Sequence, residues 1–113
     1  MLTLPPSVRV FLATAPCDMR KQFDGLAALV RTGLGRDPQS GDLYLFRNRR
    51  GDMLKAVFFD QQGYCILAKR LCRGTFRVVL DDASASGTDV EMTASELGRL
   101  MAELSFHRHD THS

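Results

Sequence analysis

The sequence predicts a small α+β domain, in which an antiparallel β-meander of about five strands carries one N-terminal and one C-terminal helix. The length of 113 residues is that of one domain. Short β-rich runs alternate with polar, Gly-containing turns in the middle of the chain, and stripes of apolar residues at helical spacing lie on either side. We therefore expect one domain over residues 1–113, with a core over about 8–104 and a flexible polar tail over 105–113.

The first part of the chain predicts a strand and then a helix. Val8–Ala13 is rich in β-branched and aromatic residues, and Thr14–Cys17 breaks the run. Asp18 is a favourable N-cap for the helix that follows. An apolar stripe indicates which face of this helix should lie on the sheet: Met19, Phe23, Leu26, Ala27 and Val30.

Four further runs in the middle of the chain read as strands separated by turns. They are Leu43–Phe46, Met53–Phe59, Tyr64–Lys69 and Thr75–Leu80. The turn at Arg49–Gly51 should join the first two as a hairpin, because Gly tolerates the positive φ that such turns require.

A linker and a second helix should follow the strands. Asp81–Asp89 is polar and rich in Ser, which is typical of a loop. Thr93 followed by Glu96 is the pattern of a capping box at a helix start. The helix behind it presents its own apolar stripe: Ala94, Leu97, Leu100, Met101 and Leu104.

Composition excludes several classes of protein. Hydrophobic residues make up 44% and charged residues 25%, which is ordinary for a globular chain and excludes general disorder or a collagen repeat. No apolar run is long enough to cross a membrane, and the N-terminus lacks a signal-peptide pattern, so we expect a cytoplasmic protein. Three cysteines without a CxxC motif favour free thiols over a disulfide framework or a zinc site.

Charge is strongly segregated along the chain. Residues 47–77 carry eight basic and two acidic side chains, a net charge of +6, whereas residues 78–113 carry two basic and seven acidic ones, a net of −5. A dense cationic block suits the repeating phosphates of a nucleic acid. The aromatic residues among these cations have two interpretations: they form the core, which we favour, or they stack on unpaired bases.

The candidate nucleic-acid-binding residues follow from this block. A second pair of cations lies near Asp18, where it opposes the dipole of the predicted helix; this placement is either functional or a simple pairing of Arg20 with Asp24. The complete candidate set is Arg47, Arg49, Arg50, Lys55, Lys69, Arg70 and Arg73, with Arg20 and Lys21 second.

The sequence gives little support for an enzyme. It lacks the nucleophile-elbow, P-loop, dinucleotide and zinc-protease motifs. Its scattered aspartates, Asp18, Asp24, Asp52 and Asp60, have no His or Glu near them in sequence to complete a nuclease metal site. The histidines after Phe106 lie in the polar tail. We expect no catalytic residues, no metal and no cofactor.

Ordered blocks of residues carry a resemblance to a known family. They are Val10–Thr14 followed by Asp18–Leu26, Asp37–Asp52 with Lys55, Phe59–Cys65, Lys69–Leu71 and Arg73–Phe76. The chain thereby resembles the TnpB-type accessory protein, encoded by the second open reading frame, of the insertion sequences numbered sixty-six. It does not resemble the RNA-guided nuclease of the same name. The chain departs from the family pattern in lacking Trp near Phe58 and a Trp-Pro pair after Phe76, so any contact made by those residues is weakened.

The resemblance implies a mobile-element protein that is encoded beside a separate transposase and needed for DNA transposition, with no known catalytic residues. The leading hypothesis is a non-enzymatic accessory factor that contacts DNA, the cognate transposase, or both. The alternative is a protein-interaction module that docks on the transposase without touching DNA, through the acidic segment 91–103 or through Asp18–Lys21. A small nuclease ranks third. The oligomeric state is open.

Overall fold

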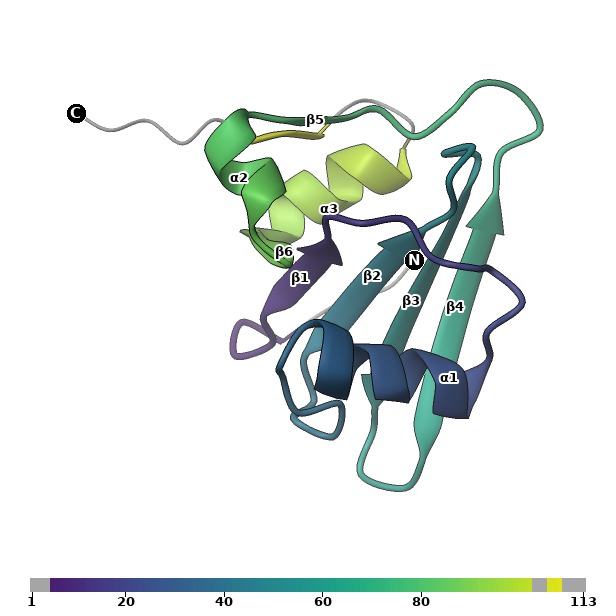
Figure 1. The fold of residues 1–113 in the computed structure, drawn as a ribbon. Coiled ribbons are helices and arrows are strands. Elements are labelled where there is room, and N and C mark those ends of the chain that lie inside the picture. The colour runs from purple at the N-terminus through teal and green to yellow at the C-terminus, as the bar shows by residue number, and fades with distance from the viewer. Residues whose placement is uncertain (1–4, 103–105, 109–113) are drawn as a thin grey trace.

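A computed structural model describes residues 5–102 and 106–108 of the chain. Five strands form one mixed sheet in the order β4-β3-β2-β1-β6, and β5 and β7 form a separate two-stranded sheet (Figure 1). No helix of the described residues is long and apolar enough to span a membrane. The elements in chain order are β1 (Val10–Ala13), α1 (Phe23–Ala28), the π-helical turn η1 (Leu29–Gly33), β2 (Leu43–Arg47), β3 (Met53–Phe59), β4 (Tyr64–Arg70), β5 (Val78–Leu80), α2 (Asp82–Ser86), β6 (Asp89–Met92), α3 (Ala94–Met101) and β7 (Phe106–Arg108).

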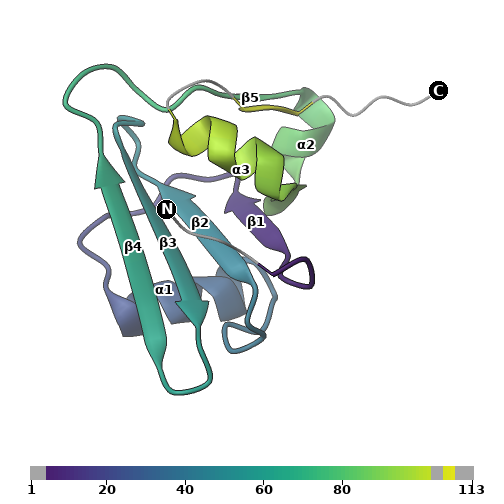
Figure 2. The same ribbon diagram turned by 180° about the vertical axis from the view of Figure 1, so that it is seen from behind.

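The sheet is covered on both faces, which makes three layers. α1 crosses one face, and α3 with the β5–β7 pair covers part of the other, as the view from behind shows (Figure 2). Alternate residues of each central strand enter the two layers, because successive side chains of a strand point to opposite faces. The α1 face buries Phe11, Tyr44, Phe46 and Val57 against Leu26 and Val30 of the helix. The α3 face buries Leu12, Leu45 and Leu54 against Leu97, Leu100, Phe76 and Phe106.

The predicted α+β class and the five-stranded sheet agree with the structure, but the meander is present only over β2, β3 and β4. These three strands pair antiparallel in sequence order, and Gly51 adopts the expected positive φ of 80° in the predicted turn. β1, by contrast, pairs parallel with β2, and β6 pairs antiparallel with the other edge of β1. The sheet is therefore mixed.

Three strands differ from the prediction for physical reasons. The run Thr75–Leu80 does not add a fifth meander strand, because Phe76 turns into the α3-face core and β5 pairs in parallel with β7. The strand β6 follows directly on the predicted linker; its alternating pattern of acidic and apolar residues is short, and its partner β1 is distant in sequence. Phe106–Arg108 lies in the predicted tail but forms β7, because Phe106 is buried under α3.

The helices also differ in detail from the sequence pattern. α1 begins after Gln22, and Asp18 caps a preceding turn by accepting a hydrogen bond from the Arg20 backbone N–H at 2.9 Å. Phe23 is 48% exposed, so its predicted place in the core was wrong. The capping box of Thr93 and Glu96 is confirmed at the start of α3, and the segment before β6 contains the unpredicted helix α2.

Candidate nucleic-acid interface

Three segments that are distant in sequence leave the sheet at the same end. The C-terminal ends of β1 and β2 lie together because these strands are parallel, and β3 begins and β4 ends beside them because each pairs antiparallel with its neighbour. Residues 14–22, the turn 48–52 and the segment 71–77 therefore meet above this end of the sheet (Figure 1). We call it the basic end, because most of the predicted cations lie on these segments.

Backbone hydrogen bonds tie the three segments together. The turn accepts bonds from the segment after β4: Phe76 N–H donates to Gly51 O at 2.8 Å, and Leu71 N–H donates to Asp52 O at 2.8 Å. On the other side, Cys17 N–H donates to Arg47 O at 2.9 Å. The cations of the basic end are thus carried on a fixed frame, although their own side chains are long.

Asn48 organises the turn itself. Its Oδ1 accepts hydrogen bonds from the backbone N–H groups of Gly51 and Met53, at 2.9 and 3.1 Å, and its Nδ2 donates to Asp52 Oδ1 at 2.6 Å. Asn48 is not among the candidate residues predicted from the sequence. Its role could have been predicted from its position at the start of a Gly-containing turn, where an Asn side chain commonly replaces backbone hydrogen bonds.

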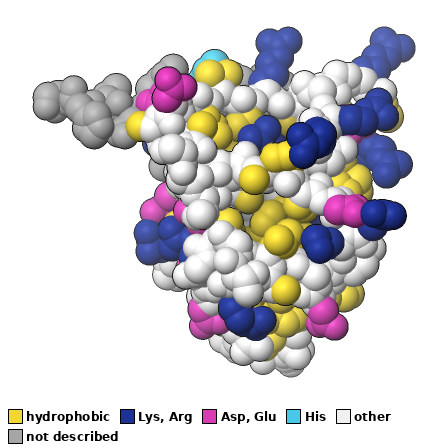
Figure 3. Space-filling model, viewed as in Figure 1, with side chains coloured by type: hydrophobic (Ala, Val, Ile, Leu, Met, Phe, Trp, Pro, Cys, Tyr) yellow, Lys and Arg dark blue, Asp and Glu magenta, His cyan; other side chains and the backbone are white. Residues whose placement is uncertain are grey.

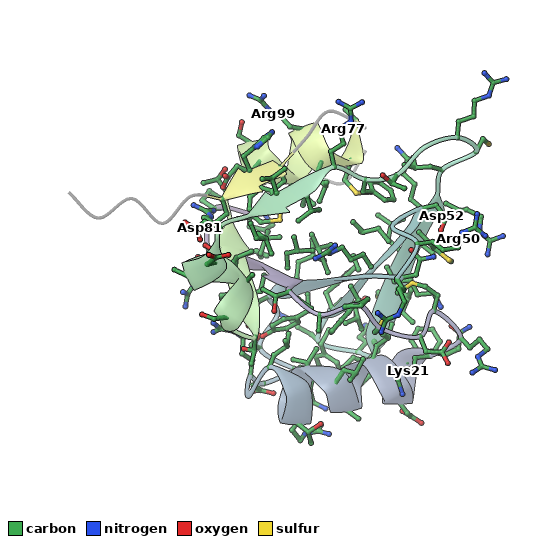
Figure 4. All side chains as sticks on the ribbon, turned by 45° about the horizontal axis from the view of Figure 1, so that its top comes forward. Lys21, Arg50, Asp52, Arg77, Asp81 and Arg99 are labelled. Carbon is green, nitrogen blue, oxygen red and sulfur yellow. The ribbon has the colours of Figure 1, made fainter. Side chains whose placement is uncertain are left out.

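Most of the predicted cations are exposed at the basic end. Arg20 and Lys21 lie on the segment before α1, Arg49 and Arg50 on the turn, and Arg70 and Arg73 at and after the end of β4. Figure 3 shows Lys and Arg side chains gathered along this side of the molecule, and Figure 4 shows Arg50 at the turn and Lys21 on the segment before α1. Within the described residues, no carboxylate forms an ion pair with Arg49, Arg50 or Arg73.

Two carboxylates lie among these cations and are held ionised. Hydrogen bonds from Arg20, with an Nη2–Oδ2 distance of 2.7 Å, lower the pKa of Asp18 to about 2. The hydrogen bond from Asn48 lowers the pKa of Asp52, and the nearby positive charges of Arg50 and Arg70 lower it further. The pairing of Arg20 with Asp18 replaces the predicted pairing with Asp24.

Three predicted cations point into the protein instead. Lys55 is 4% exposed, and its Nζ donates to the carbonyl oxygens of Met19 and Lys21 at 2.7 and 2.9 Å. Arg47 is half-buried and donates to Thr14 O at 2.9 Å, and burial lowers the pKa of its guanidinium. Lys69 Nζ donates to Met101 O at the end of α3. These three residues hold the layers around the sheet, so we leave them out of the proposed interface.

The aromatic residues among the cations belong to the core. Tyr44, Phe46 and Phe76 are all buried, which agrees with the favoured interpretation of the sequence. The pair Phe59 and Tyr64 packs edge to face with ring centroids 5.2 Å apart, at the opposite end of the sheet from the basic end. The described part of the basic end therefore has no exposed aromatic ring on which an unpaired base would stack.

The geometry also separates two of the aspartates considered from the sequence as possible nuclease ligands. Asp52 precedes β3 and Asp60 follows it, and this strand has seven residues. At about 3.3 Å per residue, the two carboxylates lie more than about 20 Å apart and cannot bind one metal ion. Within residues 5–102 and 106–108, no group of three His, Cys, Asp or Glu side chains is placed to hold a metal. The three cysteines are free thiols, with Cys72 exposed.

The fold and the site define a small α+β domain with one rigid, cationic end. Comparison with known proteins gives the family: the chain belongs to the family described as IS66 Orf2 like protein, whose profile matches residues 8–111. Two relatives from Sinorhizobium fredii (strain NBRC 101917 / NGR234) are the uncharacterized proteins y4hO and y4jC. The first is 38% identical over 94% of this chain and 89% of its own length, and the second is 35% identical over 89% and 83%. No solved structure matches.

Proposed function

We propose that this protein is a non-catalytic accessory factor of an insertion sequence, needed for DNA transposition, and that it binds the phosphate backbone of duplex DNA through the basic end. The observation that carries the proposal is the gathering of exposed cations from three segments on one hydrogen-bonded frame: Arg20, Lys21, Arg49, Arg50, Arg70 and Arg73. Family membership supports the insertion-sequence context.

Duplex DNA is favoured over a single strand. Proteins that bind single strands usually pair a cationic groove with several aromatic platforms. On the three segments of the basic end the aromatic residue is Phe76, which is buried, and the exposed Phe23 at the start of α1 is a single ring beside them. Cations spread over a turn and two flanking segments instead match the regular spacing of phosphates along a duplex. Such contacts position a protein without reading bases, so we expect binding with little sequence preference from this surface.

The alternative without DNA, docking on the transposase through the acidic residues, has less support. Glu91 forms an ion pair with Arg9 at 2.7 Å, and Glu96 pairs with Arg108 at 3.1 Å while also completing the capping box. These carboxylates have ion-pair partners within the described residues, as Arg20 does, whereas Arg49, Arg50 and Arg73 have none there. The cognate transposase remains a proposed second partner, to be tested by capture with purified protein in the presence and absence of element-end DNA.

The salt dependence of DNA affinity tests the proposal. If roughly four to six of the exposed cations contact phosphates together, the slope of log affinity against log salt should be roughly −4 to −5. The double variant Arg49→Ala/Arg50→Ala should flatten this slope by up to about two and weaken all sequences alike. Fluorescence anisotropy with labelled duplexes measures both quantities.

A matched control separates local contact from net charge. Arg31→Ala/Arg99→Ala also removes two exposed arginines, but from η1 and α3 rather than from the basic end. It should leave the slope close to that of the parent. Equal flattening by both double variants would show that only the overall charge matters, and failure of the parent to bind duplex DNA at low salt while it captures the transposase would favour the interaction module. A DNA-cleavage assay with divalent metal tests the non-catalytic assignment. The amount of cleavage should be the same for the parent and for the variants Asp52→Asn and Asp60→Asn.

A further inference from the structure

β4 presents an unpaired strand edge. It is the outermost strand of the main sheet, seven residues long, and no described segment pairs with its outer side (Figures 1 and 2). Two backbone bonds, Asp60 N–H to Gly63 O and Leu71 N–H to Asp52 O, lie just beyond the two ends of its ladder with β3 and show which residues of β4 point towards β3. Because antiparallel ladders alternate, the backbone groups that point outward are those of Tyr64, Ile66, Ala68 and Arg70.

The two edges of the sheet are protected to different extents. Globular proteins usually shield an open edge with charges, a bulge or a very short strand. β6, at the opposite edge, has four residues, and its Asp89 and Glu91 form ion pairs with Arg36 and Arg9, each at 2.7 Å. β4 has no charged residue from Tyr64 to Ala68, and Leu67 at its centre is 43% exposed.

We propose that β4 pairs antiparallel with β4 of a second copy of this chain, about a two-fold axis at Leu67. This register places outward-pointing groups opposite one another along the whole strand, with Ile66 opposite Ala68 and Tyr64 opposite Arg70 of the second copy. Moving the axis to Ile66 or Ala68 leaves an outward residue at one strand end without a partner in β4. Leu67 then faces itself at a non-hydrogen-bonded position, where the Cα atoms approach to about 4.5 Å.

Side-chain chemistry fits a second copy in this register. The exposed Leu67 side chains of the two copies cover one another on the α3 face, and Arg70 lies opposite the aromatic ring of Tyr64, with which a cation interacts favourably. Lys69 lies opposite Cys65, so no cation faces another across the axis. The same strand therefore supplies both halves of a complementary pair, as an isologous interface requires.

The pairing also has a consequence for DNA binding. This consequence rests on the proposed function, whereas the pairing itself does not. Because the two β4 strands run in opposite directions, the basic ends of the two copies lie at opposite ends of the joined sheet. A dimer of this kind would hold two DNA segments apart, one on each copy.

The oligomeric state of the whole chain, measured by light scattering across a range of concentrations without DNA, tests the pairing. The parent should form a dimer. Ala68→Pro removes an N–H group that β3 does not use and should give a monomer, since Pro is tolerated on a free edge but cannot donate to an added strand. Ala68→Thr retains the N–H group and should remain a dimer. A parent that stays monomeric overturns the proposal, as does a folded Ala68→Pro variant that dimerises like the parent.

Cross-linking tests the register independently of the proline variant. In a background with Ser at Cys17, Cys65 and Cys72, oxidised Leu67→Cys should form a dimer on a non-reducing gel, because its Cα separation suits a disulfide. Val79→Cys is the matched control. Val79 on β5 is 42% exposed, nearly the same exposed fraction as that of Leu67, and it should not cross-link. Equal cross-linking at both positions would indicate random collision and overturn the register. Protection of the β4 amides only after addition of transposase would assign the edge to a strand of that protein instead.

Discussion

Replacement of Lys55 by Met distinguishes a structural lysine from a DNA-binding one. The sequence places Lys55 among the candidate phosphate contacts, but the structure buries it on the α1 face. Its ammonium group donates to Met19 O and Lys21 O and so fixes the segment that leads into α1. Met retains most of the aliphatic stem and removes only the charged donor.

The expected loss of stability follows from the two carbonyl groups. Both bonds are part-buried, and an acceptor left without a donor costs about 1 kcal/mol, with about 3 kcal/mol as the upper limit for a fully buried one. Removal of a buried charge recovers part of this cost, because the desolvation penalty of the ammonium group disappears. We expect Lys55→Met to lower the free energy of unfolding by about 2–3 kcal/mol, which at about 4 °C per kcal/mol lowers Tm by about 8–12 °C.

The assay pairs this variant with Arg49→Met at the exposed turn. Thermal and urea unfolding measure stability, and anisotropy below the transition measures DNA affinity. Lys55→Met should unfold earlier while binding DNA with nearly the parental salt slope, and Arg49→Met should do the reverse. A Lys55→Met protein that is as stable as the parent but loses about one unit of salt slope would refute the structural assignment.

Two further predictions concern stability and pH. Phe23→Ala should cost less than about 1 kcal/mol because Phe23 is 48% exposed, whereas Leu26→Ala, at a fully buried position, should cost about 2–5 kcal/mol; urea unfolding of both variants tests the assignment of the helix face. The Asp18 carboxyl should titrate at about 2 by NMR, and Arg20→Ala should return it towards 3.8. Because the pKa of Asp18 is lower in the folded state than in the unfolded state, its pairing with Arg20 stabilises the fold above pH 3.8, and this contribution is lost as the pH falls towards 2. An Asp18 titration midpoint that is unchanged by Arg20→Ala would contradict the pairing.

Local features of the fold could be predicted from the sequence, whereas long-range ones could not. The hairpin of β2 and β3 follows from two β-rich runs and a glycine at the turn, and the start of α3 follows from Thr93 and Glu96, all of which interact within a few residues. The exposure of Phe23 depends on where α1 lies on the sheet. Phe23 is the first residue of α1, and this end of the helix lies over the edge strand β4, beyond which no described strand continues the sheet (Figure 1). Helical spacing alone carries no such information.

The candidate site shows the same division. Charge density along the chain identified the turn cations Arg49 and Arg50, which are exposed. It could not separate them from Lys55, because the side chain of Lys55 is buried only on account of the sheet face that α1 covers. Arg47 and Lys69 were likewise grouped by sequence proximity. Their contacts with Thr14 and Met101 join segments that are more than 30 residues distant in the chain.

The feature that the sequence did not predict is also the one that assembles the basic end. In a continuous meander, β1 would run antiparallel to β2, and its C-terminal end would lie beside the start of β2. Arg20 and Lys21 would then leave the sheet at the opposite end from Arg49 and Arg50. The parallel pairing of β1 with β2 reverses this, because the segment after β1 must leave from the end at which β2 terminates, and the Cys17–Arg47 backbone bond holds it there. Two groups of cations, separated by nearly 30 residues in sequence, thereby become one surface.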